Sequence, residues 1–269
     1  MRLILYDGQN LLDETGSAIP VASIAKEKSD CKHIKILDGV TTIHSGAFRG
    51  FDQVLKLTLA DTVEVIESHA FEGCHLLVEI VWSRNLRVIG YYSFGGCKSI
   101  KSLVLPPLVS QVGISAFNEC RGLTSVFLPE RLAHVGPCCF RFCEKLIILQ
   151  TSANTSFGYD FISGTRLLEN SSFENCNQGE IESIKLWLLD RHNDSPLHQI
   201  CCSTDSSLER IIQVVKDEGS FASLVQIDSL GLTPLDYLDV NPFVDFTQPQ
   251  LVKYLVLDMM GQLESIQTL

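Results

Sequence analysis

Two groups of cysteines and histidines have side chains that could hold a metal ion or activate a nucleophile. The first group lies within residues 134–143, and the second lies within residues 192–202. Zn²⁺ prefers thiolate and imidazole ligands, and a cysteine thiolate beside a basic group is a nucleophile. The two groups consist of His134, Cys138, Cys139 and Cys143, and of His192, His198, Cys201 and Cys202. Whether these side chains can converge depends on the elements that carry them.

The first group belongs to a repeat in which a phenylalanine returns every 23 residues (71 − 48 = 23). A cysteine follows three residues after most of these phenylalanines, a small residue precedes each one, and apolar residues recur at fixed distances behind it. A fixed interval of this length predicts a solenoid, in which each coil stacks on the last and buries its apolar face. The phenylalanine and cysteine columns are Phe48, Phe71, Phe94, Phe117 and Phe140, and Cys74, Cys97, Cys120 and Cys143.

Each unit also contains a Leu-x-x-Leu-x-Leu segment, which predicts a short strand with alternating inward and outward side chains. Stacked copies predict a parallel sheet, and Pro106 and Pro129 should end sheet pairing because proline lacks a donor. The outward positions form the predicted binding face. They are Lys56, Thr58, Glu79, Val81, Ser102, Val104, Ser125, Phe127, Ile148 and Gln150.

Val81, Val104 and Phe127 predict an apolar stripe along that face. Exposed apolar patches often mark interaction sites, which favours protein binding. Valine and phenylalanine also favour strands in general, and the helical half of the chain could cover the stripe. Both interpretations are open at the level of the sequence.

The repeat unit of residues 43–149 closely resembles the BspA-type leucine-rich repeat. Its clearest stretches are Val112-Gly-Ile-Ser-Ala-Phe-Asn-Glu-Cys120 and Leu123-Thr-Ser-Val-Phe-Leu-Pro129. The resemblance implies a leucine-rich-repeat parallel β-solenoid of about six coils that binds a ligand or a protein. Members of that family are known as surface adhesins in bacteria and parasites, so a cell-surface or secreted adhesin is the alternative function.

The repeat argues against metal binding and catalysis. Cys139 and Cys143 face the coil interior by register, whereas His134 lies between two inward positions and should point outward, so the ligands would not converge. The chain carries no phosphate loop, nucleophile elbow or dinucleotide fingerprint. We predict no catalytic residues, no metal and no cofactor. A cysteine-dependent enzyme is the third hypothesis. It ranks below the other two because a catalytic cysteine must be an exposed thiolate, whereas the ladder cysteines are expected to be buried.

The register is expected to fail after Leu149. Phe173 and Cys176 repeat the Phe-x-x-Cys spacing, but 33 residues separate Phe173 from Phe140 (173 − 140 = 33). Residues 180–192 then have the periodicity of an amphipathic helix. Ser195-Pro-Leu-His198 and residues 228–235 resemble the ankyrin signature, with Asp236 in place of the second histidine.

These patterns predict four segments. They are an N-terminal cap at residues 1–25, a leucine-rich-repeat solenoid at 26–160, a degenerate coil and linker at 161–178, and a small all-α ankyrin-like domain at 179–269. Proline at the first turn of a helix and Ser or Thr as its cap agree with the helical assignment.

The charge is uneven. Residues 1–160 hold 15 Lys and Arg against 16 Asp and Glu, whereas residues 161–269 hold 6 against 16. No basic stripe exists, so nucleic acid is not an expected partner. A secretory signal and a membrane span are both absent from the sequence, and the cysteines have packing roles as reduced thiols. We therefore predict a cytoplasmic, non-catalytic interaction module or scaffold whose partner is a protein.

Overall fold

The computed structural model describes residues 2–20, 24–168, 181–190 and 196–202, with further short stretches between residues 210 and 242. The chain divides into two compact units between Leu186 and Trp187. The sequence placed the corresponding boundary at residue 179.

The N-terminal segment continues the sheet of the first coils. Strand β1 (Arg2–Tyr6) pairs antiparallel with β2 (Leu11–Leu12) and parallel with β3 (Cys31–Ile36), and helix α1 (Ile24–Asp30) precedes β3. Ile4 and Tyr6 are buried, and the Tyr6 ring meets the edge of the Phe48 ring. The segment therefore covers the apolar end of the first coil, as a capping element of a solenoid must.

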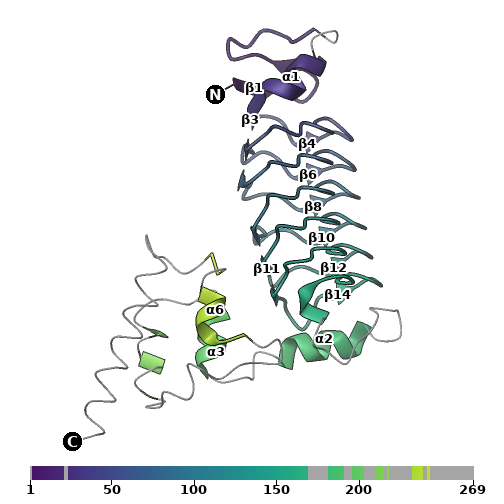
Figure 1. Ribbon diagram of the computed structural model, residues 1–269. Coiled ribbons are helices and arrows are strands. Elements are labelled where there is room, and N and C mark those ends of the chain that lie inside the picture. Colours follow the sequence, from purple (N-terminus) through teal and green to yellow (C-terminus); the bar gives the residue numbers. More distant parts are fainter. Residues whose placement is uncertain are drawn as a thin grey trace, which may run out of the picture. The chain divides into compact units, whose positions relative to one another are not determined.

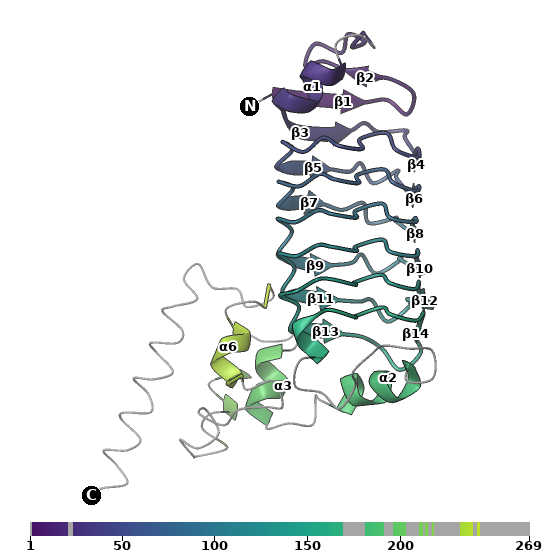
Figure 2. The same ribbon diagram turned by 45° about the vertical axis from the view of Figure 1, so that its right-hand side comes forward.

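The rest of the first unit is a parallel solenoid with strands along two opposite sides (Figures 1 and 2). Neighbouring coils pair in parallel, mostly at the 23-residue interval, so the predicted β-solenoid is confirmed. On the side that carries β3, the sheet is interrupted between β7 and β9. Six strands along one side bound about five full turns, where the sequence predicted about six coils. One side holds β3, β5 (Lys56–Thr58), β7 (Glu79–Val81), β9 (Ser102–Val104), β11 (Ser125–Phe127) and β13 (Ile148–Gln150); the other holds β4 (Thr42–Ile43), β6 (Val65–Ile66), β8 (Val88–Ile89), β10 (Gln111–Val112), β12 (His134–Val135) and β14 (Ser156–Phe157).

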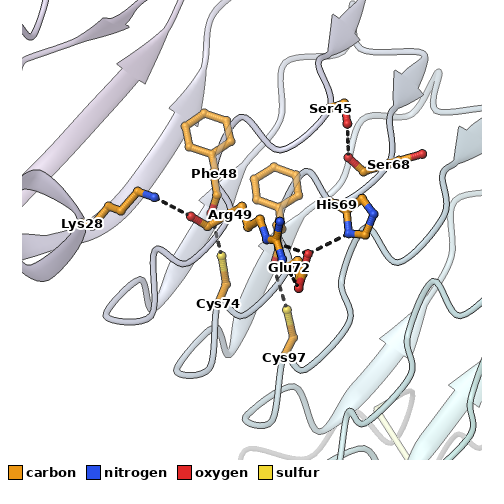
Figure 3. A network of polar contacts seen from close by, with 10 residues as sticks. Lys28, Ser45, Phe48, Arg49, Ser68, His69, Glu72, Cys74 and Cys97 are labelled. Carbon is orange, nitrogen blue, oxygen red and sulfur yellow. Dashed lines mark hydrogen bonds and ion pairs between the residues drawn. The ribbon is translucent and has the colours of Figure 1, made fainter. Parts of the chain in front are cut away.

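The five repeating phenylalanines form a continuous stack through the core. Adjacent rings lie 5.1–5.7 Å apart with their planes within 18° of parallel. Each ring is buried, which stabilises the fold by about 1.5–3 kcal/mol per side chain. The cysteine column runs beside the stack, and each thiol donates to the carbonyl of a phenylalanine one coil earlier. Figure 3 shows the first two of these contacts, Cys74 to Phe48 and Cys97 to Phe71, both 3.4 Å.

Each coil turns its corner with two residues in the left-handed region, two positions before and two positions after the phenylalanine. Their φ angles lie between 51° and 74°. Glycine adopts this conformation without a steric cost, but several coils place a larger residue there. The two columns are Gly46, His69, Tyr92, Ser115, Cys138 and Asp160, and Gly50, Gly73, Gly96, Glu119, Phe142 and Gly164.

The 23-residue register is lost after Leu149, as expected, but the coil itself continues. Strand β14 pairs with β12. In the earlier coils, the amide of each stacked phenylalanine donates to the carbonyl of the residue that directly precedes the phenylalanine of the next coil. The Phe140 amide donates in the same way to the Phe161 carbonyl (2.7 Å). Ile162, buried, therefore takes the phenylalanine position after 22 residues (162 − 140 = 22). This coil is one residue shorter than the others and carries isoleucine in place of phenylalanine, so neither the 23-residue interval nor the repeated residue type was present to identify it. The predicted positions Phe173 and Cys176 lie outside the described residues.

A short 3₁₀ helix at Arg166–Leu168 follows the last coil, and the described helices come next: α2 (Ile181–Asp190), α3 (Pro196–Cys202) and α6 (Pro234–Leu238). Helices α3 and α6 pack together; the ring Nε2 of His198 lies 3.2 Å from the Leu232 carbonyl oxygen. Thr233 precedes α6, and both its amide and its hydroxyl donate to the Asp236 carboxylate. The carboxylate accepts from the amide at the start of the helix, which is one half of a capping box, so Asp236 stabilises the start of the helix.

Candidate protein-binding surface

The first three strands of the predicted face carry exposed outward side chains. Val81 and Val104 are 42% and 36% exposed. Lys56 and Glu79 form an ion pair across adjacent coils (Nζ to Oε1, 2.5 Å). The other polar positions of this part, Thr58 and Ser102, are half-buried. This part of the face presents two valines beside a paired lysine and glutamate.

The last two strands of the face are withdrawn from solvent. Phe127 is paired in register with Val104, as predicted, but it is only 3% exposed. Ser125 and Ile148 are buried as well, and Gln150 is half-buried. The expected stripe of three exposed apolar residues is therefore reduced to Val81 and Val104. The alternating strand pattern predicted that Phe127 lies in register with Val104, but it could not predict that the Phe127 side chain is buried.

Three further apolar residues of the same coils are exposed, and the sequence interpretation missed them. Leu55, Leu76 and Val78 are 37%, 40% and 55% exposed, and the Val78 amide donates to the Leu55 carbonyl of the preceding coil (3.0 Å). Leu55 and Val78 directly precede strands β5 and β7. We name Leu55, Leu76, Val78, Val81 and Val104 the strand-side patch. A column of residues just before each strand was the signal that could have revealed it.

Lysines surround the strand-side patch. Lys32 and Lys101 occupy the same column as Leu55 and Val78, one coil to either side (55 − 32 = 101 − 78 = 23). Lys35 and Lys98 are exposed nearby in the repeat, and within the described residues Lys35, Lys98 and Lys101 form no ion pair with a carboxylate. Burial and the neighbouring Lys56 lower the pKa of His33, so this imidazole is neutral at pH 7. The patch is thus apolar at its centre and basic at its margin.

The cysteine and histidine groups do not form a site in the described part of the chain. Cys139 and Cys143 are buried, whereas His134 is exposed and its Nδ1 lies 2.9 Å from the Ser156 hydroxyl. Among the described residues, no three metal-ligating side chains lie close enough to hold an ion. In the second group, His198 and Cys201 are buried, and the side chains of His192 and Cys202 are outside the described residues.

The ladder thiols are poor nucleophiles. Burial raises the pKa of Cys74 and of Cys120 to about 12, and it also raises the pKa of Cys97 and Cys143. Cys138 is partly exposed, but burial and the Asp160 carboxylate raise its pKa too. All these thiols are protonated at neutral pH, which is the unreactive form.

No helix among the described residues has both the length and the apolar character needed to cross a bilayer. Residues 22–147 match the family described as BspA type leucine rich repeat region, in six copies. No curated protein matches the chain.

Several solved structures resemble the chain. A leucine rich cell surface protein from Faecalibacterium prausnitzii A2-165 is 27% identical over 45% of this chain and 32% of its own, with a TM-score of 0.43. The T. pallidum leucine rich repeat protein is 23% identical over 59% of this chain and 86% of its own, with a TM-score of 0.42. A leucine-rich repeat protein from Bacteroides ovatus ATCC 8483 is 23% identical over 50% and 49%, with a TM-score of 0.38. The chain thus spans about a third of the Faecalibacterium protein and about half of the Bacteroides protein.

Proposed function

Because residues 22–147 are a BspA-type leucine-rich repeat region, we propose that the chain is a non-catalytic interaction module that binds a protein on the strand side of its solenoid. Stacked repeats present an extended rigid surface, and leucine-rich repeats generally bind proteins there. The observation that carries the proposal is the strand-side patch, whose five apolar side chains are each exposed and lie on three consecutive coils. A cluster of this kind is what a protein partner would bury.

The composition of the patch defines the partner's chemistry. Its apolar centre calls for an apolar segment, and Lys35, Lys98 and Lys101 at its margin favour carboxylates around that segment. Complementary charge of this kind accelerates association and selects the orientation of binding. The partner is therefore a protein surface or segment with apolar side chains bordered by Asp and Glu. Phe127, Ser125 and Ile148 are not part of the contact surface in this proposal, since they are buried.

The cysteines support a non-catalytic role in a reducing compartment. The ladder cysteines and Cys139 are free thiols buried in the core. Free thiols packed as small apolar side chains are typical of the cytoplasm. We place the chain there as a scaffold; a cell-surface or secreted adhesin is the alternative, and it would use the same patch.

We also propose that the C-terminal unit is ankyrin-like. It is supported by the packing of α3 against α6, by the bond from the Asn241 side-chain amide to the Cys201 carbonyl (2.8 Å), and by the capping interaction at Thr233. Far-ultraviolet circular dichroism of the whole chain tests the assignment through its helical content. Helical content well above that of α1, α2, α3 and α6 together would support helical repeats, whereas its absence would contradict them.

The binding proposal is tested by recovering partners from the soluble extract of the source cells. We expect the wild-type chain to retain a protein that the Val81→Asp, Val104→Asp double variant loses. A Gln111→Asp, Ala133→Asp variant serves as the matched control, because it adds the same charge at exposed positions in β10 and just before β12, on the other strand side of the solenoid. Each recovered protein is then titrated, in purified form, with the three chains. Equal affinity for wild type and for the strand-side variant would contradict the proposal.

A further inference from the structure

Figure 2 shows the side of the solenoid that carries the six-stranded sheet from β4 to β14. A second column of exposed apolar residues follows the strands of this sheet in the sequence. We name it the corner ridge; it consists of Tyr91, Ile114, Pro137 and Tyr159. These residues hold the same position in four successive coils. Tyr91, Ile114 and Tyr159 are 45%, 48% and 50% exposed, and Pro137 is half-buried.

The backbone holds the corner ridge in strict register. The carbonyl of each ridge residue accepts a hydrogen bond from the preceding coil, at 2.8 Å for Tyr91, 3.0 Å for Ile114, 2.8 Å for Pro137 and 2.9 Å for Tyr159. A glycine precedes every ridge residue, and there the coils touch. A Cβ on Gly113 would lie 2.7 Å from the backbone of Gly90. The side chains of the ridge are therefore displayed at the spacing of the coils, about 4.8 Å.

Aromatic packing fixes the first end of the ridge. The Tyr91 ring meets the His69 ring edge-on, with centroids 4.9 Å apart, and Tyr92 packs beside both. His69 is itself held by Glu72, which pairs with Arg49 (Figure 3). These contacts leave little side-chain freedom to lose on binding, and tyrosine offers an apolar ring with a polar tip.

The corners around the ridge are acidic. The loops of residues 67–73, 90–96, 113–119, 136–142 and 158–164 contain four carboxylates and a single guanidinium, Arg141. The carboxylates are Glu67, Glu72, Glu119 and Asp160. Arg141 lies over the Phe142 ring, 4.6 Å from its centroid. Arg49 pairs with Glu72, and Arg121 lies 3.8 Å from the Glu119 carboxylate, so the acidic character of the corners comes mainly from Glu67 and Asp160. Burial, Glu119 and Glu72 raise the pKa of Tyr92, so its hydroxyl is a hydrogen-bond donor at neutral pH.

The spacing of the ridge matches one regular peptide conformation. Two coils span about 9.6 Å, and a polyproline II helix repeats its face every three residues, or about 9.3 Å. Side chains i and i+3 of such a helix would thus meet Tyr91 and Pro137, or Ile114 and Tyr159. The backbone carbonyls of a polyproline II segment have no internal partners, so tyrosine hydroxyls can donate to them.

We propose that the corner ridge is a docking surface for a proline-rich protein segment in the polyproline II conformation that carries arginine or lysine. Aromatic surfaces bind such segments because the ligand is already ordered, and the acidic corners select the basic residue. The proposal uses no residue of the strand-side patch, so each can fail without the other.

The test is a fluorescence anisotropy titration of the whole chain with labelled peptides of about ten residues. The peptides are repeats of Pro-Pro-x with one arginine, placed in turn at every x position, and matched peptides carry serine in place of every proline. We expect at least one proline peptide to bind at least about tenfold more tightly than its serine counterpart. We also expect the Tyr91→Ala, Tyr159→Ala variant to weaken that binding at least about tenfold, as loss of interface tyrosines does.

Two controls keep the result unambiguous. The Val81→Asp, Val104→Asp variant should bind the peptide as wild type does, and Tyr91→Phe should retain most of the binding if the ring contact dominates. The proposal is overturned if no proline peptide binds better than its serine counterpart, or if the ridge variant binds as wild type. Concentration-dependent self-association that requires the ridge tyrosines, seen by light scattering without peptide binding, would assign the ridge to a second copy and also overturn it.

Discussion

Phe127 and Val104 are direct neighbours on parallel strands, yet Val104 is 36% exposed and Phe127 only 3%. The two side chains therefore have different roles on one face. Val104 belongs to the exposed strand-side patch, whereas Phe127 contributes to packing.

We expect Val104→Asp to change the free energy of unfolding by less than about 1 kcal/mol, because an exposed substitution loses little. Phe127→Asp should lower it by about 3–5 kcal/mol, since a large buried ring is lost and an unpaired charge is buried. Urea unfolding of both variants measures the difference. Equal destabilisation by the two substitutions would mean that Phe127 is not packed as described.

The glycine column beside the corner ridge should be intolerant of side chains. A Cβ at Gly113 would lie 2.7 Å from the Gly90 carbonyl carbon, closer than real contacts allow, so the coils would have to separate. We expect Gly113→Ala to lower the free energy of unfolding by about 1–3 kcal/mol. Gln111→Ala, at an exposed position of the same coil, is the control and should be neutral. A Gly113→Ala chain as stable as wild type would contradict the close stacking.

Substitutions at the left-handed corner positions should change stability in opposite directions, depending on whether glycine is introduced or removed. Glu119 has φ 58° and Gly96 has φ 74° at equivalent corners of adjacent coils. Glu119→Gly should raise stability by about 1 kcal/mol, because glycine relieves the left-handed strain. Gly96→Ala should lower it by a similar amount, although its Cβ would meet nothing closer than 3.9 Å. Thermal unfolding of both variants measures the effect, and shifts of the same sign in both would refute it.

The cysteine ladder should make the protein sensitive to alkali. Burial raises the pKa of Cys74 and Cys120 from 9.0 to about 12 in the folded state. The folded chain therefore holds these protons more tightly than the unfolded chain. The stabilisation is complete below pH 9 and is lost as the pH rises from about 9 towards 12.

Urea unfolding at pH 8 and pH 10.5 measures this loss, and a Cys97→Ala, Cys120→Ala variant should show a smaller decrease than wild type. At pH 8 a thiol reagent should modify the partly exposed Cys138 before the buried ladder cysteines. A wild-type chain whose stability is unchanged between the two pH values would contradict the protonated ladder.

The sequence predicted the interior of the solenoid well because the interior repeats. Phe48 to Phe140 recur at a fixed interval, and every one of them is buried in the stack that this interval implies. The same regularity placed the outward positions on their strands. It could not show that Phe127 is covered, since burial depends on packing that no local pattern records.

The sequence did not predict the last coil or the corner ridge, for different reasons. Ile162 replaces phenylalanine after 22 residues, so both the residue and the interval changed, although Gly158 continues the column of Gly90, Gly113 and Gly136. The ridge lies at a corner with left-handed residues, where the strand rule of alternating directions does not hold. The exposure of Tyr91, Ile114 and Tyr159, and the backbone bonds that hold them in register, became visible only in the structure.

The hydrogen bonds around the phenylalanines recur from coil to coil, and in the shorter last coil the Ile162 carbonyl accepts the equivalent bond from the Thr165 amide. Each coil therefore presents to the following coil the same packing surface that the preceding coil presents to it. A solenoid built in this way changes length in whole layers: removing residues 95–117 would join Phe94 to Asn118, and Cys120 would take the place of Cys97. The number of layers, and with it the length of both exposed columns, is thus a quantity that can vary by duplication or loss without a new fold.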